Sequence, residues 1–170
     1  MKIKTTSQRS RLFSWLAAVL LCLLIASITG CSSLPDASPA MSQQALSFTP
    51  PPGQAGVYVI RQSQFLGGAV LNKIDLDYQE FGVLKTSSYL FGMVSPGEHT
   101  LRTSDLPSAV VVPFTAEAGK NYFFEARASL TANAILVKPI SETDGRAYVR
   151  KFKLSGENRF ELQIPPGQTQ

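Results

Sequence analysis

The sequence predicts a mainly all-β protein, an antiparallel β-sandwich of about seven or eight short strands with one short C-terminal helix. Three observations lead to this class. Short segments rich in β-branched and aromatic residues recur at roughly ten-residue intervals from residue 56 onward. Turn signals such as Pro96-Gly97 and Ala118-Gly119-Lys120 separate these segments. Residues 53–155 are enough for one β-sandwich domain with a single modest core.

Most of the expected strands alternate between apolar and polar positions, as half-buried strands do. Their ranges are 56–61, 70–77, 81–86, 89–94, 98–103, 109–115, 121–129 and 133–138. The alternation is clearest in 121–129, where Tyr122 and Phe124 share one face and Phe123 and Glu125 share the other. The core is therefore expected to contain Val57, Val59, Ile74, Leu76, Leu101, Val110, Val112, Phe114, Tyr122 and Phe124.

One helix is predicted near the end of the domain. Ser141, with Asp144 three residues later, resembles a capping box. Gly145 weakens this prediction, because glycine destabilises a helix by about 1 kcal/mol relative to alanine. Apolar residues that could face the sheet are Ala147, Val149 and Phe152. The C-terminal half of this segment contains basic residues, which interact favourably with the helix dipole: Arg146, Arg150, Lys151 and Lys153. This basic cluster is either a solvated helix end or a contact with anionic lipid or lipopolysaccharide.

The N-terminal segment has the composition of a bacterial lipoprotein signal peptide. Basic residues come first, and residues 12–28 are then almost wholly apolar. Ile28-Thr29-Gly30-Cys31 resembles a lipobox, in which the cysteine is acylated and becomes the first residue of the mature chain. Cleavage is therefore expected between Gly30 and Cys31, with lipid on Cys31. The alternative is an uncleaved transmembrane anchor, since about seventeen apolar residues lie near the lower limit for crossing a bilayer.

The rest of the expected organisation follows from composition. Residues 1–30 form the signal peptide, and residues 31–52 form the lipidated cysteine and a flexible Ser/Pro-rich tether. The sandwich occupies 53–155, and 156–170 is either an edge strand or a disordered tail. Ser32, where aspartate would favour the inner membrane, points to the periplasmic face of the outer membrane.

Removal of the signal changes the charge balance. The full chain has 16 Lys and Arg against 12 Asp and Glu. Four of these bases, Lys2, Lys4, Arg9 and Arg11, lie in the signal, so the mature chain is neutral. The basic pI is therefore no argument for nucleic-acid binding. Cys22 would be removed and Cys31 acylated, which leaves no thiol for a disulfide or a thiolate metal site.

The sequence contains little that could build an active site. His99 has no second histidine or free cysteine with which to hold a metal, and we expect it to seal the edge of the core. Asp75 and Asp77 would lie about 7 Å apart on one strand face, a spacing that glycosidase carboxylates use but that solvated acids share. No catalytic, metal or cofactor residue is predicted. Tyr58 and Phe123 are either buried or form an exposed aromatic face for a sugar or a protein.

Five runs in order carry a resemblance to a known domain: PPPGQAGVYVIRQSQFLGGAV (50–70), IDLD (74–77), FGVL (81–84), SPGEHTL (95–101) and EAGKNYFF (117–124). They resemble a bacterial lipoprotein domain of unknown function with the pattern PPPGxAxVYVYR, LDG, GxL, PGxHxL and AGKxYF. The pattern is also similar to the PEGA repeat, a small β-sandwich. The resemblance implies an all-β fold and no catalytic residues. Tyr78 replaces the glycine that follows LD, which predicts a longer or differently turned hairpin.

Together these observations predict a membrane-anchored envelope lipoprotein whose sandwich is a non-catalytic interaction or structural module. The alternative is a periplasmic module that binds a glycan or a small ligand, and an envelope hydrolase is the least expected. The expected partners are the membrane, through the N-terminal lipid, and an envelope protein, with no nucleic acid and no cofactor.

Overall fold

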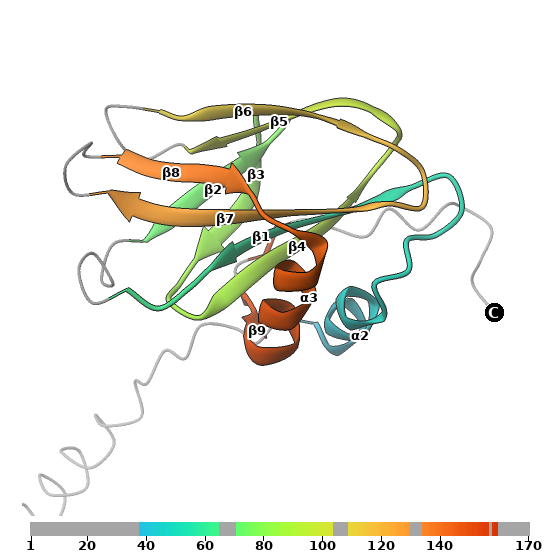
Figure 1. The fold of residues 1–170 in the computed structure, drawn as a ribbon, viewed down its shortest axis with the longest axis horizontal. Helices are drawn as coiled ribbons and strands as arrows, with labels where there is room; N and C mark the ends of the chain where they lie inside the picture. Colours follow the sequence, from blue (N-terminus) through green and yellow to red (C-terminus); the bar gives the residue numbers. More distant parts are fainter. Residues whose placement is uncertain (1–37, 65–70, 104–108, 130–133, 157, 160–170) are drawn as a thin grey trace, which may run out of the picture. The chain divides into compact units, whose positions relative to one another are not determined.

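The computed structural model of the protein describes residues 38–64, 71–103, 109–129, 134–156 and 158–159. In these residues two sheets lie face to face, and two helices cover the outer side of one sheet (Figure 1). Sheet A has the strand order β8-β7-β1-β4-β9, and sheet B has the order β3-β2-β5-β6. The predicted mainly all-β sandwich with a C-terminal helix is therefore confirmed.

The strands match the predicted order along the chain. Sheet A consists of β1 (Ala55–Arg61), β4 (Ser88–Val94), β7 (Asn121–Ser129), β8 (Ala134–Pro139) and β9 (Lys153–Leu154). Sheet B consists of β2 (Asn72–Leu76), β3 (Gln79–Leu84), β5 (Gly97–Thr103) and β6 (Val111–Ala116). Most neighbours are antiparallel, but β1 runs parallel to β7 and β4 runs parallel to β9. Strand alternation cannot reveal these parallel pairings, because it is the same in both directions.

The main core lies between the two sheets. Six of the ten predicted core residues are buried there: Val57, Val59, Ile74, Leu76, Leu101 and Phe124. The other four, Val110, Val112, Phe114 and Tyr122, are only partly buried. Three of these four lie in or just before β6, which pairs only with β5 among the described strands. The position of these three residues at the edge of sheet B explains why they keep contact with solvent.

The predicted C-terminal helix is α3 (Glu142–Lys151). The Ser141 hydroxyl accepts a hydrogen bond from the Asp144 backbone N–H at 3.1 Å and donates one to the Asp144 carboxylate at 2.6 Å. This cap satisfies one of the helix's unpaired N–H groups. Glu142 and Asp144 lie in the first turn, and Arg150 and Lys151 lie in the last turn, so both ends complement the helix dipole.

Gly145 has a packing role that the sequence did not reveal. This residue is buried where α3 crosses β7, and a Cβ atom added to it would overlap the ring of Phe123. The small residue therefore lets the helix approach the sheet closely, which offsets its poor helix propensity.

A second helix, α2 (Pro39–Ser47), lies where a flexible tether was expected. Ala45 is 0% exposed, and Phe48, which ends the helix in a left-handed conformation with φ 53°, is 6% exposed. The tether prediction for 31–52 is therefore wrong from Pro39 onward. Most residues of this helix are small or polar and only Ala45 of the nine is buried, so the segment shows no helical periodicity in the sequence.

The β2–β3 hairpin was predicted to be longer or differently turned, and the longer loop is not observed. Leu76 pairs with Gln79, so Asp77 and Tyr78 alone form the loop. Both have positive φ, 51° and 63°, as a type I′ turn requires. Asp77 thus lies in a turn and not on the strand with Asp75. Tyr78, which replaces the glycine expected from the resemblance, adopts a conformation that favours glycine.

Several predictions concern residues outside the described part of the chain. Gly30, Cys31 and the whole signal peptide lie there, as do Val70, Asn133 and residues 160–170. Of the predicted tail, Asn158 forms a bridge with Gly82 of β3. Among the described residues, neither helix has the length and apolar character needed to cross a membrane.

Candidate functional site

The single histidine is held by two acceptors at the end of the β2–β3 hairpin. His99 Nδ1 lies 2.7 Å from Asp77 Oδ2, and His99 Nε2 lies 2.8 Å from the Ser95 carbonyl oxygen. Asp77 Oδ1 accepts a hydrogen bond from the Thr100 N–H at 2.9 Å, and the Asp77 N–H donates to the Thr100 carbonyl at 2.9 Å. The pair thus fastens the hairpin turn to β5. Because both ring nitrogens have a partner in the protein, this arrangement favours a structural role over proton transfer to a substrate.

The second candidate carboxylate has a different partner. Asp75 Oδ2 lies 3.8 Å from Arg102 Nη1, and the two residues are opposite each other in the pairing of β2 with β5. Asp75 and Asp77 were expected to share one strand face. They instead face separate basic groups, Arg102 and His99, which does not match the open carboxylate pair of a glycosidase. Among the described residues, no three His, Cys, Asp or Glu side chains are grouped so that they could hold a metal ion.

The two aromatic residues considered for an exposed binding face are buried. Tyr58 is 1% exposed and Phe123 is 3% exposed, and their rings stack at 4.6 Å with an interplanar angle of 17°. Both lie on the outer side of sheet A, beneath the layer formed by α2 and α3. The aromatic face therefore belongs to a second core between sheet A and the helices, and it is not open to a sugar.

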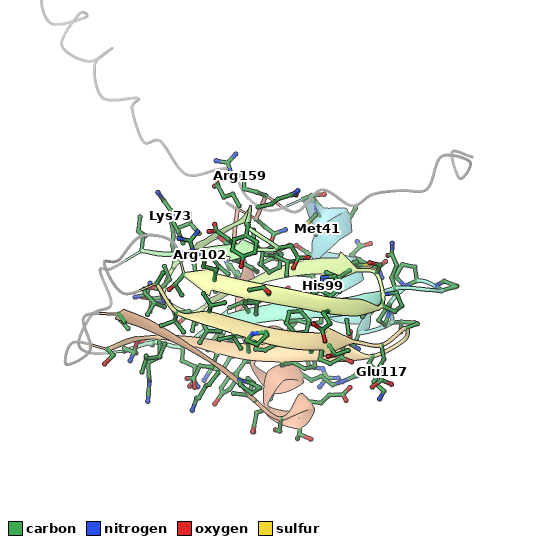
Figure 2. The ribbon with its side chains drawn as sticks, turned by 90° about the horizontal axis from the view of Figure 1, so that it is seen from above. Met41, Lys73, His99, Arg102, Glu117 and Arg159 are labelled. Atoms are coloured by element: carbon green, nitrogen blue, oxygen red, sulfur yellow. The ribbon has the colours of Figure 1, made fainter. Side chains whose placement is uncertain are left out.

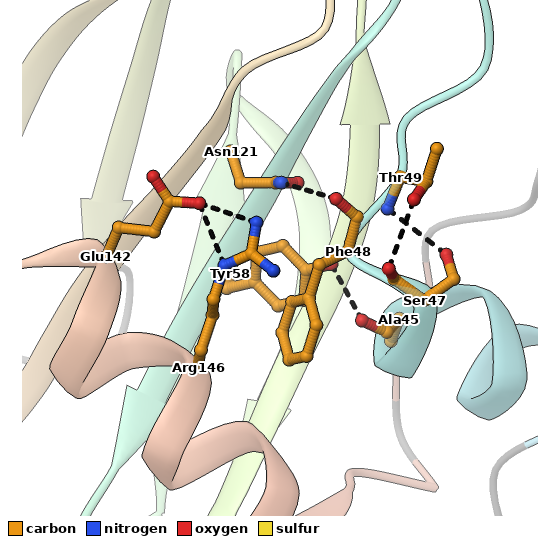
Figure 3. A network of polar contacts seen from close by, with 8 residues as sticks. All are labelled: Ala45, Ser47, Phe48, Thr49, Tyr58, Asn121, Glu142 and Arg146. Carbon is orange, nitrogen blue, oxygen red and sulfur yellow. Dashed lines mark hydrogen bonds and ion pairs between the residues drawn. The ribbon is translucent and has the colours of Figure 1, made fainter.

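Polar contacts fasten α2 to this second core (Figure 3). The Tyr58 hydroxyl donates a hydrogen bond to the Ala45 carbonyl at 2.8 Å, and Asn121 Nδ2 donates one to the Phe48 carbonyl at 2.8 Å. Both carbonyls lie at the C-terminal end of α2, where the last carbonyl groups have few partners within the helix, although that of Ala45 also accepts from the Phe48 N–H at 3.4 Å. Burial raises the pKa of Tyr58 well above its usual value. Its hydroxyl therefore stays protonated and remains a donor.

Two cations from α3 complete the attachment. The guanidinium of Arg146 lies 4.6 Å from the centre of the Phe48 ring, and that of Arg150 lies 5.2 Å from it. Arg146 also forms an ion pair with Glu142, four residues earlier, at 2.6 Å. Cation–π contacts of this kind contribute about 0.5–2 kcal/mol each. The two helices thus hold each other as well as the sheet.

The outer face of sheet B has a different character. Three residues form a row across strands β2, β5 and β6: Asp75 is paired with Arg102, and Arg102 is paired with Val111. Val111 is 51% exposed and the turn residue Tyr78 is 72% exposed. Figure 2, seen from the side of β5 and β6, labels Arg102 and other residues of this region. No described helix covers this face. We define the open face as its outward positions on β2, β5 and β6 together with the turn residue Tyr78.

Two buried polar side chains were not anticipated from the sequence. Arg61 is 1% exposed at the end of β1, and its Nη1 donates to the Leu84 carbonyl at 3.1 Å. Asn72 is 0% exposed and is paired with Leu84 in the sheet, yet neither its Oδ1 nor its Nδ2 has a hydrogen-bond partner among the described residues. Burial lowers the pKa of Arg61. In the sequence both residues lie at the ends of apolar runs and look like ordinary strand boundaries.

Comparison with known proteins places the chain in a family. No solved structure matches it significantly. A protein of Haemophilus influenzae (strain Rd), described as uncharacterized, is 25% identical over 131 residues, which are 75% of this chain and 77% of that protein. A family model described as "Protein of unknown function (DUF2846)" matches residues 51–140. That segment includes β1 to β8 and excludes both α2 and α3. The chain belongs to the DUF2846 family.

Proposed function

We propose that this chain is a lipid-anchored protein of the bacterial cell envelope, and that its sandwich is a non-catalytic interaction or structural module. The observation that carries the proposal is the short stretch of chain between the lipobox-like motif and the first described helix. The lipobox-like residues end at Cys31, and the first described helix begins only eight residues later, at Pro39. Such a chain attaches a folded domain directly beside a membrane. Ser32 after the cysteine favours the periplasmic face of the outer membrane.

The non-catalytic role is supported by the partners of the polar groups. His99 and Asp77 contact each other, and each also contacts a backbone group, the carbonyl of Ser95 and the N–H of Thr100 respectively. Asp75 faces Arg102. The open face of sheet B is then the surface on which the module can meet an envelope protein. Its mixture of a charged pair with the exposed apolar residues Val111 and Tyr78 suits a protein partner.

Mass spectrometry of the protein isolated from membranes tests the anchor. We expect the N-terminal peptide to begin at Cys31 and to carry a diacylglyceryl group and an acyl chain. Cys31→Ala should leave the membrane fraction, whereas the matched control Cys22→Ala, inside the signal, should remain lipidated. An unmodified chain that starts at Met1, or a Cys31→Ala variant that stays with membranes, would contradict the anchor.

A second experiment tests the role of the module. We expect His99→Gln, Asp75→Asn and Asp77→Asn to preserve cellular function in every variant that still folds. A photo-crosslinking residue at Val111 should capture an envelope protein, and the same residue at Thr143 on α3 should not. The module would be an enzyme instead if the purified protein hydrolysed an envelope substrate and these substitutions abolished turnover without lowering the melting temperature.

A further inference from the structure

The start of α2 contacts the chain segment that follows α3 and β9. Asn158 Nδ2 donates to Met41 Sδ at 2.9 Å, while Asn158 Oδ1 accepts from the Phe91 N–H at 3.0 Å. Met41 therefore lies next to the segment that follows β9. The half-buried rings of Tyr148 and Phe152 stack at 5.7 Å and pack against the same buried cluster as Met41. We call this region, made of the first turn of α2, the last turn of α3 and β9, the α2–β9 end.

The exposed side chains of the α2–β9 end are mostly basic. Lys151 and Lys153 are exposed on either side of Phe152, and neither forms an ion pair with another described residue. Tyr148, Lys151 and Phe152 are three and four residues apart, so they lie on the same side of α3. Residues 150–159 carry four bases and one acid, Glu157, and Asp36 precedes α2. Of these bases, Arg150 lies over the Phe48 ring and Arg159 forms an ion pair with Glu80 at 3.5 Å. The net charge of this end is therefore positive.

The length of chain before α2 brings this end close to the anchor. Seven residues, 32–38, separate Cys31 from Pro39. Even when fully extended they span roughly 30 Å from Cα to Cα, against about 75 Å for the tether expected from the sequence. A lipid on Cys31 would therefore keep the start of α2 near the bilayer surface, and the α2–β9 end would be the nearest part of the described domain.

We infer that the α2–β9 end rests on the anionic headgroups of the bilayer, an inference that rests on the proposed lipid anchor at Cys31. Lys151 and Lys153 contact lipid phosphates, and the partly exposed rings of Tyr148 and Phe152 lie at headgroup level. Lysines beside aromatic rings suit this region, since each ring has an apolar body and the ammonium groups are attracted to anionic lipid. The open face of sheet B is on the other side of the sandwich and stays available to a partner protein.

The test uses the full lipidated protein reconstituted in vesicles. Cys22 would be lost with the signal and Cys31 would be a thioether, so an introduced cysteine is the only free thiol. An environment-sensitive fluorophore is attached to Ala40→Cys, in the first turn of α2, or to Thr115→Cys, on the open face. Both positions are exposed. Quenching by acrylamide, which is uncharged, is then measured in phosphatidylcholine vesicles with and without phosphatidylglycerol.

We expect phosphatidylglycerol to reduce quenching of the Ala40→Cys label at least about twofold and to leave the Thr115→Cys label unchanged. The double variant Lys151→Gln/Lys153→Gln should lose the reduction, as should high salt. The control Lys120→Gln/Lys138→Gln, with the same change in net charge, should keep it. Equal quenching in both vesicles, or a reduction that survives the Lys151/Lys153 variant, would overturn the inference while leaving the anchor intact. Failure of the wild-type protein to float with vesicles would overturn the anchor and the inference together.

Discussion

The outer faces of the two sheets show how one sandwich can have a closed side and an open side. On sheet A the outward positions hold Tyr58, Phe91 and Phe123, which are buried beneath α2 and α3. On sheet B the corresponding positions hold Asp75 and Arg102, and no described helix covers them. The strands differ accordingly, because β1 and β4 are buried at every position, whereas burial alternates along β2 and β6. A strand that is apolar on both faces is therefore covered by a second layer, whereas an alternating strand leaves one face without such a layer.

The largest expected effect comes from removing a ring of the closed face. Phe123→Ala deletes a side chain that is 3% exposed and stacked on Tyr58, so it should lower the free energy of unfolding by about 3–5 kcal/mol. The matched change on the open face, Val111→Ala, should cost about 0.5 kcal/mol or less. Urea denaturation of the purified variants, followed by circular dichroism, measures both. Equal losses would show that the two faces do not differ in this way.

Alkaline pH should weaken the closed face specifically. Burial raises the pKa of Tyr89 to about 12 from 10.0. Between these values the folded protein keeps a proton that the unfolded chain has released, so the free energy of unfolding falls as pH rises. The loss is about 1.4 kcal/mol per pH unit and up to roughly 3 kcal/mol in all, and below pH 10 the contribution is fully present.

Denaturation curves at several pH values test this dependence. Tyr89→Phe has no group to titrate, so its stability should fall less steeply between pH 10 and pH 12 than that of the wild type. Tyr58 is also buried and has a raised pKa, which means that some loss should persist in the variant. Identical slopes for the two proteins would contradict the burial of the Tyr89 hydroxyl.

At one glycine of the closed face, helix propensity and packing predict opposite changes in stability. If α3 were a free surface helix, Gly145→Ala should raise the free energy of unfolding by about 1 kcal/mol. Because the added methyl group would overlap Phe123, we expect a loss of about 1–3 kcal/mol instead. Combining it with Phe123→Leu should recover part of the loss, which a double-mutant cycle can measure. Stabilisation by the single change would mean that α3 does not pack closely on β7.

The smallest expected effect lies on the open face and is a gain. Tyr78 has φ 63° and a side chain that is 72% exposed, so it strains the backbone while packing little. Tyr78→Gly should raise the free energy of unfolding by about 0.5–1 kcal/mol, since glycine adopts this conformation without strain. Tyr78→Ala, which removes the ring but keeps the Cβ atom, is the control and should give no such gain. A destabilised Tyr78→Gly variant would indicate that the ring makes a contact of its own.

Much of the fold could be predicted because it depends on local patterns. All eight predicted strands overlap observed ones, since alternation and turn residues report directly on a half-buried sheet. The helix α3 was predictable from its Ser141–Asp144 cap. Helix α2 was not, because its stability comes from contacts with Tyr58, Asn121 and α3 that the local sequence does not encode. The type I′ turn at Tyr78 was missed because tyrosine is an unusual residue for that conformation.

The candidate site was less predictable than the fold. The sequence identified His99, Asp75 and Asp77 as isolated polar residues. The partners of the two aspartates, Arg102 and His99, both lie on β5, which only the folded sheet brings close to them. Tyr58 and Phe123 could have been exposed or buried, and the answer depended on an unanticipated helix. Buried Arg61 and Asn72 left no signal, since strand ends often carry such residues.

Helix α2 covers the outer face of sheet A and limits the predicted tether to the residues before Pro39. Hydrogen–deuterium exchange of the lipidated protein tests this claim most directly. A nine-residue helix without tertiary contacts is marginal in water and would exchange rapidly. We expect peptides from 42–48 to be protected to a degree similar to peptides from α3. If those peptides exchanged as fast as an unfolded chain while β1 and β7 stayed protected, the closed face would be open and the domain would have a long tether after all.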